Sequence, residues 1–369
     1  MNTIKELVQR NTTHLSGMFT IHADGAFLNG AGLGSGEDKN RTTVKTYYRH
    51  KAIPYVSSQA WRRWLRNTLI DETGWKASEI EAVMWNKKGN TSKVAGQLDP
   101  LNYPEDDIFG YMFAVKGGEA SKKDESTEDD DEKKADRRLP TKGLIRNSPF
   151  KSSLLRGVAS LTRVAKDDGY VHLRDDTPVP YTTQFYSGEL SALFGLDVYR
   201  LGVFEKKGSV SEELDEFLIS ENKDLIDTSE HPMYKDGTLV MRKELIPYQN
   251  STTMELLKAL ARLRGGAKLA QFGVDVSPRL MIVVGMKSGN LLFDDLLIEL
   301  EGQPGLNLEA LKQIISDYKD RFTTSVFIGY RTGYLANEKE LSELSEVNGV
   351  KIIHGSPIEI VDKLTTELS

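Results

Sequence analysis

The sequence contains no cysteine. A disulfide framework and a thiol nucleophile are therefore both excluded, and a reducing compartment fits the composition. No stretch approaches the roughly 18 consecutive apolar residues that a membrane-spanning helix needs. The first ten residues, MNTIKELVQR, lack the apolar region of a secretory signal. We therefore expect a cytoplasmic protein that does not enter a membrane.

Motifs for catalysis and for metal binding are also missing. The six histidines include no pair at metal-ligand spacing, and His22 with Asp24 is the combination that comes nearest to such a site. There is no G-x-S-x-G motif, and the alternating glycines 30–36 fit neither a dinucleotide fingerprint nor a P-loop. We expect no cofactor, no metal and no catalytic residue. Asp24, where a strand passes into a loop, is the one carboxylate whose position could matter.

The balance of charge is uneven along the chain. The 369 residues carry a net charge of −6, and 39% of them are hydrophobic, which is typical of a globular protein of mixed α and β structure. Two windows, 39–66 and 137–166, each hold eight Lys or Arg and no Asp or Glu. The remaining 311 residues hold 32 basic against 54 acidic side chains. A surface polarised in this way would attract a polyanion in a salt-dependent manner.

The stretch PYVSSQAWRRWLRNTL, residues 54–69, predicts a strand end followed by a helix. Ser57 or Ser58 fits the N-cap position. At about 100° per residue, one side of the helix would carry Trp61, Trp64, Leu65, Thr68 and Leu69, and an adjacent arc would carry Arg62, Arg63 and Arg66. Three guanidinium groups close together suit a string of phosphates. The alternative is the solvated face of an ordinary amphipathic helix.

The second basic window mixes cations with small hydroxyl residues. Arg146, Lys151 and Arg156 lie among Ser148, Ser152 and Ser153. Such residues commonly contact phosphate oxygens. The alternative is a set of exposed Lys and Arg side chains on a loop and a strand edge. Residues 116–136, directly before the second window, form a charged, low-complexity segment that we expect to be a mobile loop.

The remaining pattern predicts alternating strands and helices. We expect strands at 13–22, 108–115, 279–284, 325–330 and 350–354, extended segments within 170–205, and helices at 78–85, 252–263, 308–321, 338–346 and 358–368. The 252–263 helix should end at Gly265 and Gly266 in a left-handed C-cap. Residues 206–250 are acidic and irregular, which indicates an excursion from the main body.

Several segments resemble the DevR-type backbone subunit of type I CRISPR interference complexes of subtype I-B. They are GAFLNGAG, PYVSSQAWRRWLRNTL, DIFGYMFA, IRNSPFKSS, LARLRGGAKLA and SPRLMIVVG, in that order between residues 13 and 285. The resemblance implies an α+β fold, an RNA-recognition-motif (ferredoxin-like) palm with finger and thumb insertions. It implies one elaborated domain over 1–369. Its parts would be the first part of the palm at 13–115, the loop 116–136, insertions at 137–250, and completion of the palm at 251–369.

The resemblance also implies a function. Copies of such a subunit stack along a CRISPR guide RNA and hold its sugar-phosphate backbone. The thumb, here either 170–186 or 206–250, displaces a base at regular intervals, so that the other bases pair with target DNA. Further expected partners are the 5′-handle-capping, large and small subunits of a Cascade complex in antiviral defence and the guide-processing endonuclease. The chain lacks the aromatic motifs of sheet-face RNA readers, so we do not expect that mode of binding.

Contacts to the guide RNA are expected from both windows and from the glycine segments that carry the resemblance. The expected set is Asn29, Gly30, Lys39, Asn40, Arg41, Lys45, Ser57, Ser58, Gln59, Arg62, Arg63, Arg66, Arg146, Ser148, Lys151, Ser152, Arg156, Gly265 and Gly266. Two alternatives stay open. One is an RNA-cleaving relative of the type III kind that uses Asp24, and the other is a generic α/β protein without a nucleic-acid function.

Overall fold

The computed structural model describes residues 3–33, 41–85, 89–115, 133–134 and 137–368. The chain divides into two compact units, each assembled from separate stretches of sequence. Unit 1 comprises Met1–Arg10, Gly74–Phe150 and Asp197–Thr252, and unit 2 comprises Asn11–Thr73, Lys151–Leu196 and Thr253–Ser369. A large mixed sheet with few helices makes the protein an α+β protein, as predicted. Among the described helices, none is long and apolar enough to cross a membrane.

Unit 2 is built on the large sheet. Its strands are β1 (His14–Ala26), β2 (Gly30–Leu33), β3 (Arg41–Val44), β4 (Thr46–Arg49), β5 (Lys51–Val56), β12 (Leu155–Val171), β13 (Val179–Leu196), β17 (Leu280–Met286), β20 (Val326–Tyr330), β21 (Glu346–Val347) and β22 (Val350–Gly355). The order is β21-β22-β20-β17-β1-β13-β12-β5-β4, with β2 and β3 on a side branch from β13. β11 (Phe150–Ser152) also pairs with β13. β1 is antiparallel to both of its neighbours, β13 and β17.

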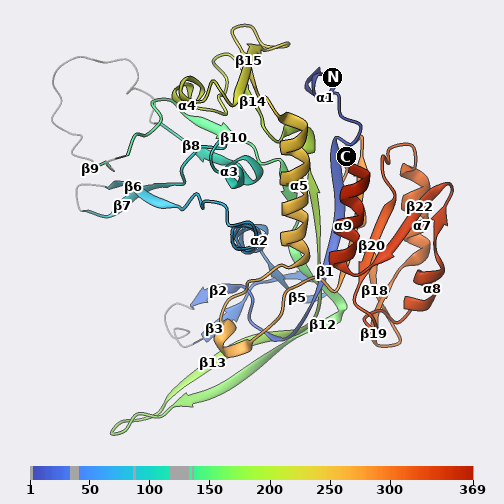
Figure 1. Ribbon diagram of the computed structural model, residues 1–369. Helices are drawn as coiled ribbons and strands as arrows, with labels where there is room; N and C mark the ends of the chain where they lie inside the picture. The colour runs from blue at the N-terminus through green and yellow to red at the C-terminus, as the bar shows by residue number, and fades with distance from the viewer. Residues whose placement is uncertain (1–2, 34–40, 86–88, 116–132, 135–136, 369) are drawn as a thin grey trace. The chain divides into compact units, whose positions relative to one another are not determined.

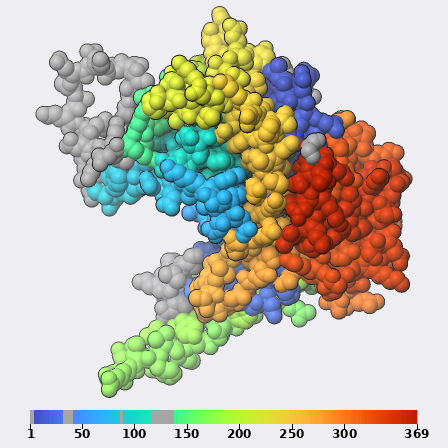
Figure 2. All heavy atoms as spheres, viewed as in Figure 1, coloured from blue at the N-terminus to red at the C-terminus, as the bar shows by residue number. Residues whose placement is uncertain are grey.

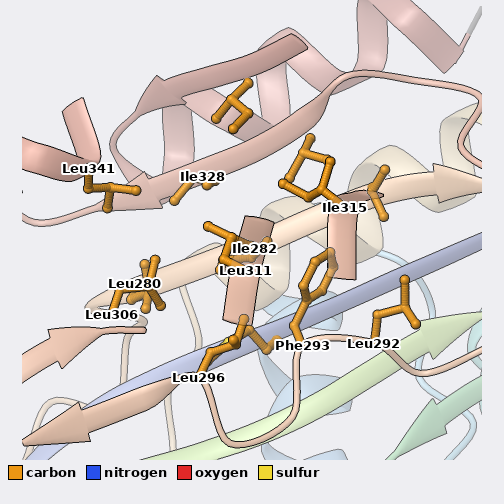
Figure 3. Packing of buried hydrophobic residues seen from close by; sticks show 14 of the residues in the cluster. Leu280, Ile282, Leu292, Phe293, Leu296, Leu306, Leu311, Ile315, Ile328 and Leu341 are labelled. Atoms are coloured by element: carbon orange, nitrogen blue, oxygen red, sulfur yellow. The ribbon is translucent and has the colours of Figure 1, made fainter. Parts of the chain in front are cut away.

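β1 lies at the centre of this sheet with both faces covered. One face packs against a helix, because the rings of Phe19 and Trp61 meet edge to face at 5.4 Å between centroids. The other face carries Met18, which joins a buried cluster with Phe293, Leu311 and Ile315 (Figure 3). Both faces of β1 are therefore occupied by side chains of the same unit over these positions. This accounts for a strand that is apolar without strict alternation.

The helices and the short hairpin of unit 2 complete this core. They are α2 (Ser58–Thr73), the part of α5 (Leu245–Ala261) that begins at Thr253, α6 (Leu269–Phe272), α7 (Leu308–Tyr318), α8 (Glu338–Glu343), α9 (Pro357–Leu368) and the pair β18 (Leu297–Leu300) and β19 (Gln303–Leu306). The predicted helices and strands after residue 250 are confirmed within a few residues, except that α5 begins seven residues before the predicted 252.

β12 and β13 form a long hairpin whose outer part we call the arm, residues 165–181. The two strands are 17 and 18 residues long and stay in register to the pair Val171 and Val179. Every residue of the arm is exposed except Gly169, which is half-buried. Figure 1 shows the two strands running out from the rest of their sheet. The extended segments predicted for 170–205 are thus confirmed over most of their length.

Unit 1 consists of small sheets and short helices, and the surface of the part around α4 can be followed in Figure 2. It holds α1 (Thr3–Val8), α3 (Pro104–Phe109), α4 (Glu216–Glu221), the 3-10 turn η2 (Val198–Arg200), and the part of α5 up to Thr252. The sheets are β7-β6-β9, β10-β8 and β14-β16-β15. Their strands are β6 (Glu81–Trp85), β7 (Thr91–Ala95), β8 (Tyr111–Phe113), β9 (Lys133–Lys134), β10 (Leu144–Arg146), β14 (Val203–Lys206), β15 (Ile226–Glu230) and β16 (Thr238–Arg242).

Three sequence predictions in unit 1 are wrong. Residues 81–85 form strand β6 and not part of a helix. The predicted strand 108–115 begins inside helix α3, and only Tyr111–Phe113 is extended. The segment 206–250 is not irregular, since it contains α4, β15, β16 and the start of α5. The loop predicted for 116–136 lies outside the described residues apart from β9.

Candidate nucleic-acid interface

α2 carries the arginines that the sequence singled out, and its buried face orients them. Trp61, Leu65, Thr68 and Leu69 are buried, as predicted, and Trp64 is half-buried. The Trp61 indole Nε1 donates a hydrogen bond to the backbone oxygen of Ser153 at 2.8 Å. A helix anchored in this way has a fixed rotation about its own axis. Its arginine face is consequently directed away from the core.

The three arginines of α2 differ in exposure and surroundings. Arg63 is exposed, whereas Arg62 and Arg66 are half-buried. Burial lowers the pKa of Arg62, and the positive charge of Arg66 lowers it further. Two like charges held near one another in a partly desolvated place raise each other's energy. An anion that reached both guanidinium groups would relieve that cost, and phosphate is the anion that arginine forks match best.

Arg62 also connects the two basic windows of the sequence. Its Nη1 lies 3.4 Å from the hydroxyl oxygen of Ser152, to which it donates. Ser152 belongs to the second window, and its neighbour Lys151 is half-buried in the same unit. Residues some ninety positions apart therefore meet on one side of α2. Tertiary structure brings together part of the predicted set.

The first turn of α2 is joined to the glycine-rich segment that precedes it. The side-chain oxygen of Asn29 accepts a hydrogen bond from the backbone N–H of Ser57 at 3.1 Å. The backbone oxygen of Asn29 accepts one from the N–H of Lys45 at 3.2 Å. The Ser58 hydroxyl and the Gln59 amide oxygen are 3.4 Å apart. Asn29, with Gly30 next to it, thus lies at the start of the helix that carries Arg62.

Of the two glycines after α5, Gly265 packs against the same helix and Gly266 packs against Leu28 and Leu269. A Cβ atom on Gly265 would overlap the ring of Trp64, and one on Gly266 would lie 2.8 Å from a methyl group of Leu28. Their φ angles are +152° and +121°. These values are positive, but they are not the roughly +57° of a left-handed cap, so the predicted cap geometry is wrong. Glycine is needed at 265 because the backbone there runs directly against Trp64, and at 266 because it runs against Leu28.

Other members of the predicted set lie elsewhere in unit 2 or beyond the described residues. Arg41 is exposed on β3 and Lys45 is half-buried. The guanidinium group of Arg156 forms ion pairs with Asp294 at 2.5 Å and Asp295 at 2.8 Å, so its charge is compensated within the unit. Lys39 and Asn40 lie outside the described residues.

Arg146 was predicted to contact RNA, and the structure corrects this. The side chain is fully buried in unit 1 and forms ion pairs with Asp107 and with Glu213, the latter at 2.9 Å. It also donates to the backbone oxygens of Asp107, Val203 and Arg200. The guanidinium group is therefore satisfied inside the protein. Burial lowers the pKa of Arg146, but the charges of Asp107 and Glu213 outweigh burial and raise it.

Ser148 lies close to Arg146 in sequence and shares its position in unit 1. Its hydroxyl is within hydrogen-bond distance of the backbone oxygens of Ile108, at 3.0 Å, and Phe150, at 2.7 Å. The side chain therefore stabilises the turn between β10 and β11. A charge window in the sequence cannot reveal this, because the acidic partners of Arg146 come from residues 39 and 67 positions away.

A polar cluster on β1 was not predicted as such. His22 Nδ1 lies 2.5 Å from the carboxylate of Glu189, and the Tyr334 hydroxyl donates to the other oxygen of that carboxylate at 2.6 Å. Burial and the charge of Glu189 raise the pKa of Tyr334 well above its usual value. Asp24, two residues further along β1, is exposed. Among the described residues no group of three or more His, Cys, Asp or Glu is arranged to hold a metal ion.

Comparisons with known proteins find likeness in structure and none in sequence. No model of a protein family matches the chain, and no curated protein matches it. A chain of a solved "CRISPR RNA-guided surveillance complex, pre-nicking" matches with a TM-score of 0.53 and 12% identity, covering 97% of this chain and 100% of that one. A chain of a "CRISPR RNA-guided surveillance complex" matches with a TM-score of 0.48 and 11% identity, over 96% and 99%. At 12% identity the first likeness is one of fold.

Proposed function

We propose that this chain is a non-catalytic backbone subunit of an RNA-guided CRISPR complex. Copies of it would bind side by side along a guide RNA and present the bases for pairing with target DNA. The observation that carries the proposal is the group formed by Arg62, Arg66 and Ser152, in which Arg62 donates to a hydroxyl from the other basic window and its pKa is lowered by the like charge of Arg66. The fold likeness to a chain of a surveillance complex supports the same function.

The chemistry of this group suits binding to the sugar-phosphate backbone of RNA and does not depend on the base sequence. Arginine forks, serine hydroxyls and glycine backbone contact phosphate and ribose, which are the same at every nucleotide. A subunit that must accept any guide sequence has to leave the base edges free, so that base pairing alone provides specificity. We therefore propose the residues of the predicted set that lie in unit 2 as the RNA-binding group, which leaves out Arg146 and Ser148 of unit 1.

The order of strands supports the finer proposal of an RNA-recognition-motif palm. Along the chain, β1 is followed by α2, the hairpin β12–β13, α5 and β17. In the sheet these strands lie in the order β17-β1-β13-β12 with antiparallel pairing throughout. This is the β-α-β-β-α-β arrangement of ferredoxin-like folds. The inserted segments 27–56 and 74–150 would then be additions to that palm.

Of the two segments predicted as the thumb, we propose the one in the arm. Residues 170–186 include the outer half of the β12–β13 hairpin, which extends away from its sheet. Residues 206–250 instead pack into the core of unit 1, where Leu214, Ile226 and Val240 are buried together. The DevR-type, I-B assignment and the other expected partners, namely target DNA, the handle-capping, large and small subunits and the guide-processing endonuclease, belong to this proposal.

The proposal is tested by measuring guide RNA affinity of the double variant Arg62→Ala/Arg66→Ala. We expect affinity to fall by about tenfold or more at fixed salt, and the dependence of log K on log salt to become shallower by about one for each phosphate that is no longer bound. The control, Lys319→Ala/Arg321→Ala, removes two charges at the end of α7, where both side chains are exposed. Unchanged affinity and salt dependence in the first variant would overturn the proposal.

The RNA-cleaving alternative has its own experiment. Asp24 is exposed on β1, next to the pair formed by His22 and Glu189. The assembled complex is incubated with matched target RNA and a divalent metal ion. Regularly spaced cuts that disappear in Asp24→Ala would replace the non-catalytic proposal, and intact target RNA would support it.

A further inference from the structure

The ladders on both sides of β13 change register at the same place. In the ladder with β1 the register shifts between Ala23 and Ala26. In the ladder with β12 it shifts between Gly157 and Thr162. Gly188 borders both shifts, because it pairs with Ala23 on one side and with Thr162 on the other, and we call this place the double bulge. Bulges bend a strand and increase its twist, so the double bulge determines the direction in which the β12–β13 hairpin leaves the sheet.

The double bulge is built into the backbone by close packing of the three strands. The φ angle of Gly188 is +138°, and a Cβ atom there would overlap the backbone oxygen of Leu161 on β12. On the other side, the Ser187 hydroxyl oxygen accepts a hydrogen bond from the N–H of Gly25 on β1 at 2.8 Å. The main chain of β13 is therefore held by both of its neighbours at the bend.

The residue after Gly188 is a buried glutamate that is held by two other elements. Glu189 is 4% exposed. One oxygen of its carboxylate lies 2.5 Å from His22 Nδ1 on β1, and the other accepts a hydrogen bond from the Tyr334 hydroxyl at 2.6 Å. Its backbone oxygen accepts one from the Thr162 hydroxyl at 2.9 Å. Since pairing of β12 with β13 resumes at Thr162, Glu189 joins the base of the hairpin to β1 and to the segment after β20.

These contacts of Glu189 suit a positioning role better than a stabilising one. A carboxylate is costly to bury, and its partners offset that cost only where their geometry is good. Among the described residues, no lysine or arginine lies at ion-pair distance from Glu189. Apolar side chains would cover the same place without this cost, but apolar contacts have no preferred direction. Hydrogen bonds are directional, so those to Glu189 can hold the bend at one angle.

A small rotation at the double bulge becomes a large displacement at the tip of the arm, residues 172–178. From Thr162 to Val171 the hairpin is paired continuously, which at about 3.3 Å per residue gives a length of about 30 Å. β3 pairs with β13 only at Thr182 and Thr183, and the arm beyond them is almost entirely exposed. A rotation of about 10° would therefore move the tip by about 5 Å, roughly the spacing of neighbouring strands.

We propose that Glu189 is a positioning residue which, through His22 and Tyr334, fixes the direction in which the arm leaves the sheet. The inference deepens the proposed function and rests on it in one respect, namely that the arm is the thumb that meets the guide RNA. A thumb that reaches the RNA at a defined nucleotide has to leave its own sheet at a defined angle. Glu189 acts through the backbone of the hairpin and does not touch the RNA.

Because the chain contains no cysteine, the direction of the arm can be measured with two introduced labels. Nitroxide labels are attached at Thr177→Cys in the tip and at Lys319→Cys after α7, which are both exposed positions of unit 2. Pulsed electron paramagnetic resonance then gives the distribution of distances between the labels in the full chain. We expect one narrow distribution without further substitution. Glu189→Ala should shift its mean by about 5 Å, or broaden it by a similar amount.

Two further variants separate positioning from a general loss of stability. Glu189→Gln keeps the length of the side chain, and its amide can accept from Tyr334 and donate to His22 Nδ1, so it should restore most of the original distribution. Ile315→Val removes a methyl group from the buried cluster of the same unit and leaves the double bulge unchanged, so the arm should not move. An unchanged distribution in Glu189→Ala, or an equal shift in Ile315→Val, would overturn the inference.

RNA binding distinguishes this inference from the proposed function. In guide RNAs that carry 2-aminopurine at successive positions, a base displaced by the arm is detected by its increased fluorescence. For Glu189→Ala we expect RNA affinity close to that of the wild type, because Arg62 and Arg66 are untouched, and a fluorescence signal spread over neighbouring positions. A signal as sharp as in the wild type would overturn the inference and leave the proposed function standing. A failure of the proposed function appears instead as unchanged RNA affinity in Arg62→Ala/Arg66→Ala.

Discussion

Arg146 and Arg62 come from two equally basic windows of the sequence, and their surroundings in the structure are opposite. Arg146 is fully buried in unit 1 with Asp107 and Glu213 against it. Arg62 is half-buried in unit 2, and the charged neighbour that affects its pKa is another cation, Arg66. The ion pairs of Arg146 lie inside the protein. Burial and the charge of Arg66 both lower the pKa of Arg62, and we propose that the phosphates of a guide RNA bind near these two guanidinium groups.

The difference is one of energy as well as geometry. Removing water from a guanidinium group is costly, and only a close partner charge offsets the cost. In unit 1 that partner is built in, which makes Arg146 part of the core. In unit 2 burial and a like charge both act against the charged form of Arg62, and we propose that guide RNA offsets that cost. Two buried carboxylates from distant segments therefore identify Arg146 as a structural arginine.

The largest effect is expected for Arg146→Met. The substitution leaves the carboxylates of Asp107 and Glu213 buried without their partner, and breaking a buried pair on one side costs about 3–5 kcal/mol. The free energy of unfolding should fall by that order in urea denaturation. Arg62→Met, the matched change in unit 2, should alter it by no more than about 0.5 kcal/mol. Equal losses in the two variants would remove the distinction drawn between these arginines.

Next in size is Gly265→Ala, which tests the packing that holds α2 in place. The added methyl group would overlap the Trp64 ring, and the φ of +152° is unfavourable for alanine. We expect a loss of roughly 1–3 kcal/mol in the free energy of unfolding. Gly333→Ala is the control, because φ there is +80° and no atom lies within 4 Å of the new Cβ. If both variants were destabilised by the same amount, the contact with Trp64 would contribute nothing.

A smaller effect, on guide RNA affinity, is expected for Arg62→Lys. Arg62→Lys keeps the charge but loses the planar fork, so guide RNA affinity should fall by a factor of about ten or less, which is about 1.4 kcal/mol. Because the charge is retained, the salt dependence of binding should stay at the wild-type slope. Titrations at several salt concentrations measure both quantities. A slope reduced as much as in Arg62→Ala would mean that the lysine no longer reaches the phosphate.

The smallest effects are expected for two acidic residues of unit 1, Glu212 and Glu216. One is desolvated by burial, and the other has lysine partners. Burial raises the pKa of Glu212, whereas hydrogen bonds from Lys206 and Lys142 lower that of Glu216. A raised pKa means that ionised Glu212 costs stability at pH 7 and that the cost disappears as pH falls through its folded pKa. Glu216 contributes stability above its unfolded pKa and loses it as pH falls, though screening reduces this at an exposed site.

Glu212→Gln should therefore raise the free energy of unfolding at pH 7, by less than about 1 kcal/mol, with a smaller gain at pH 4. Glu216→Gln should lower it at pH 7, with a smaller loss at pH 4. Urea denaturation at the two pH values measures both differences. A destabilising Glu212→Gln at pH 7 would show that the hydrogen-bonding capacity of the carboxylate matters more than its desolvation.

Local pattern was sufficient where one element decides the outcome. The period of 3.6 residues in 58–69 predicted which side of α2 is buried, and four of the five residues named are. The apolar run 280–286 became the fully buried strand β17. The local sequence pattern did not predict the structure of residues 78–85, because the spacing of Ile80, Val83 and Met84 also fits a helix. Pairing with β7 made part of that segment a strand, and Ile80 is 57% exposed.

The sequence by itself determined the guanidinium face of α2, because helical spacing places Arg62 and Arg66 together whatever the rest of the chain does. It also determined that the cations gather in two windows. Only the tertiary structure decided what each cation meets. Arg146 acquired Asp107 and Glu213 from distant segments, while Arg62 acquired Ser152 from the other basic window and kept the like charge of Arg66 beside it. Electrostatic partners are set by distance in space, and distance along the chain does not reveal them.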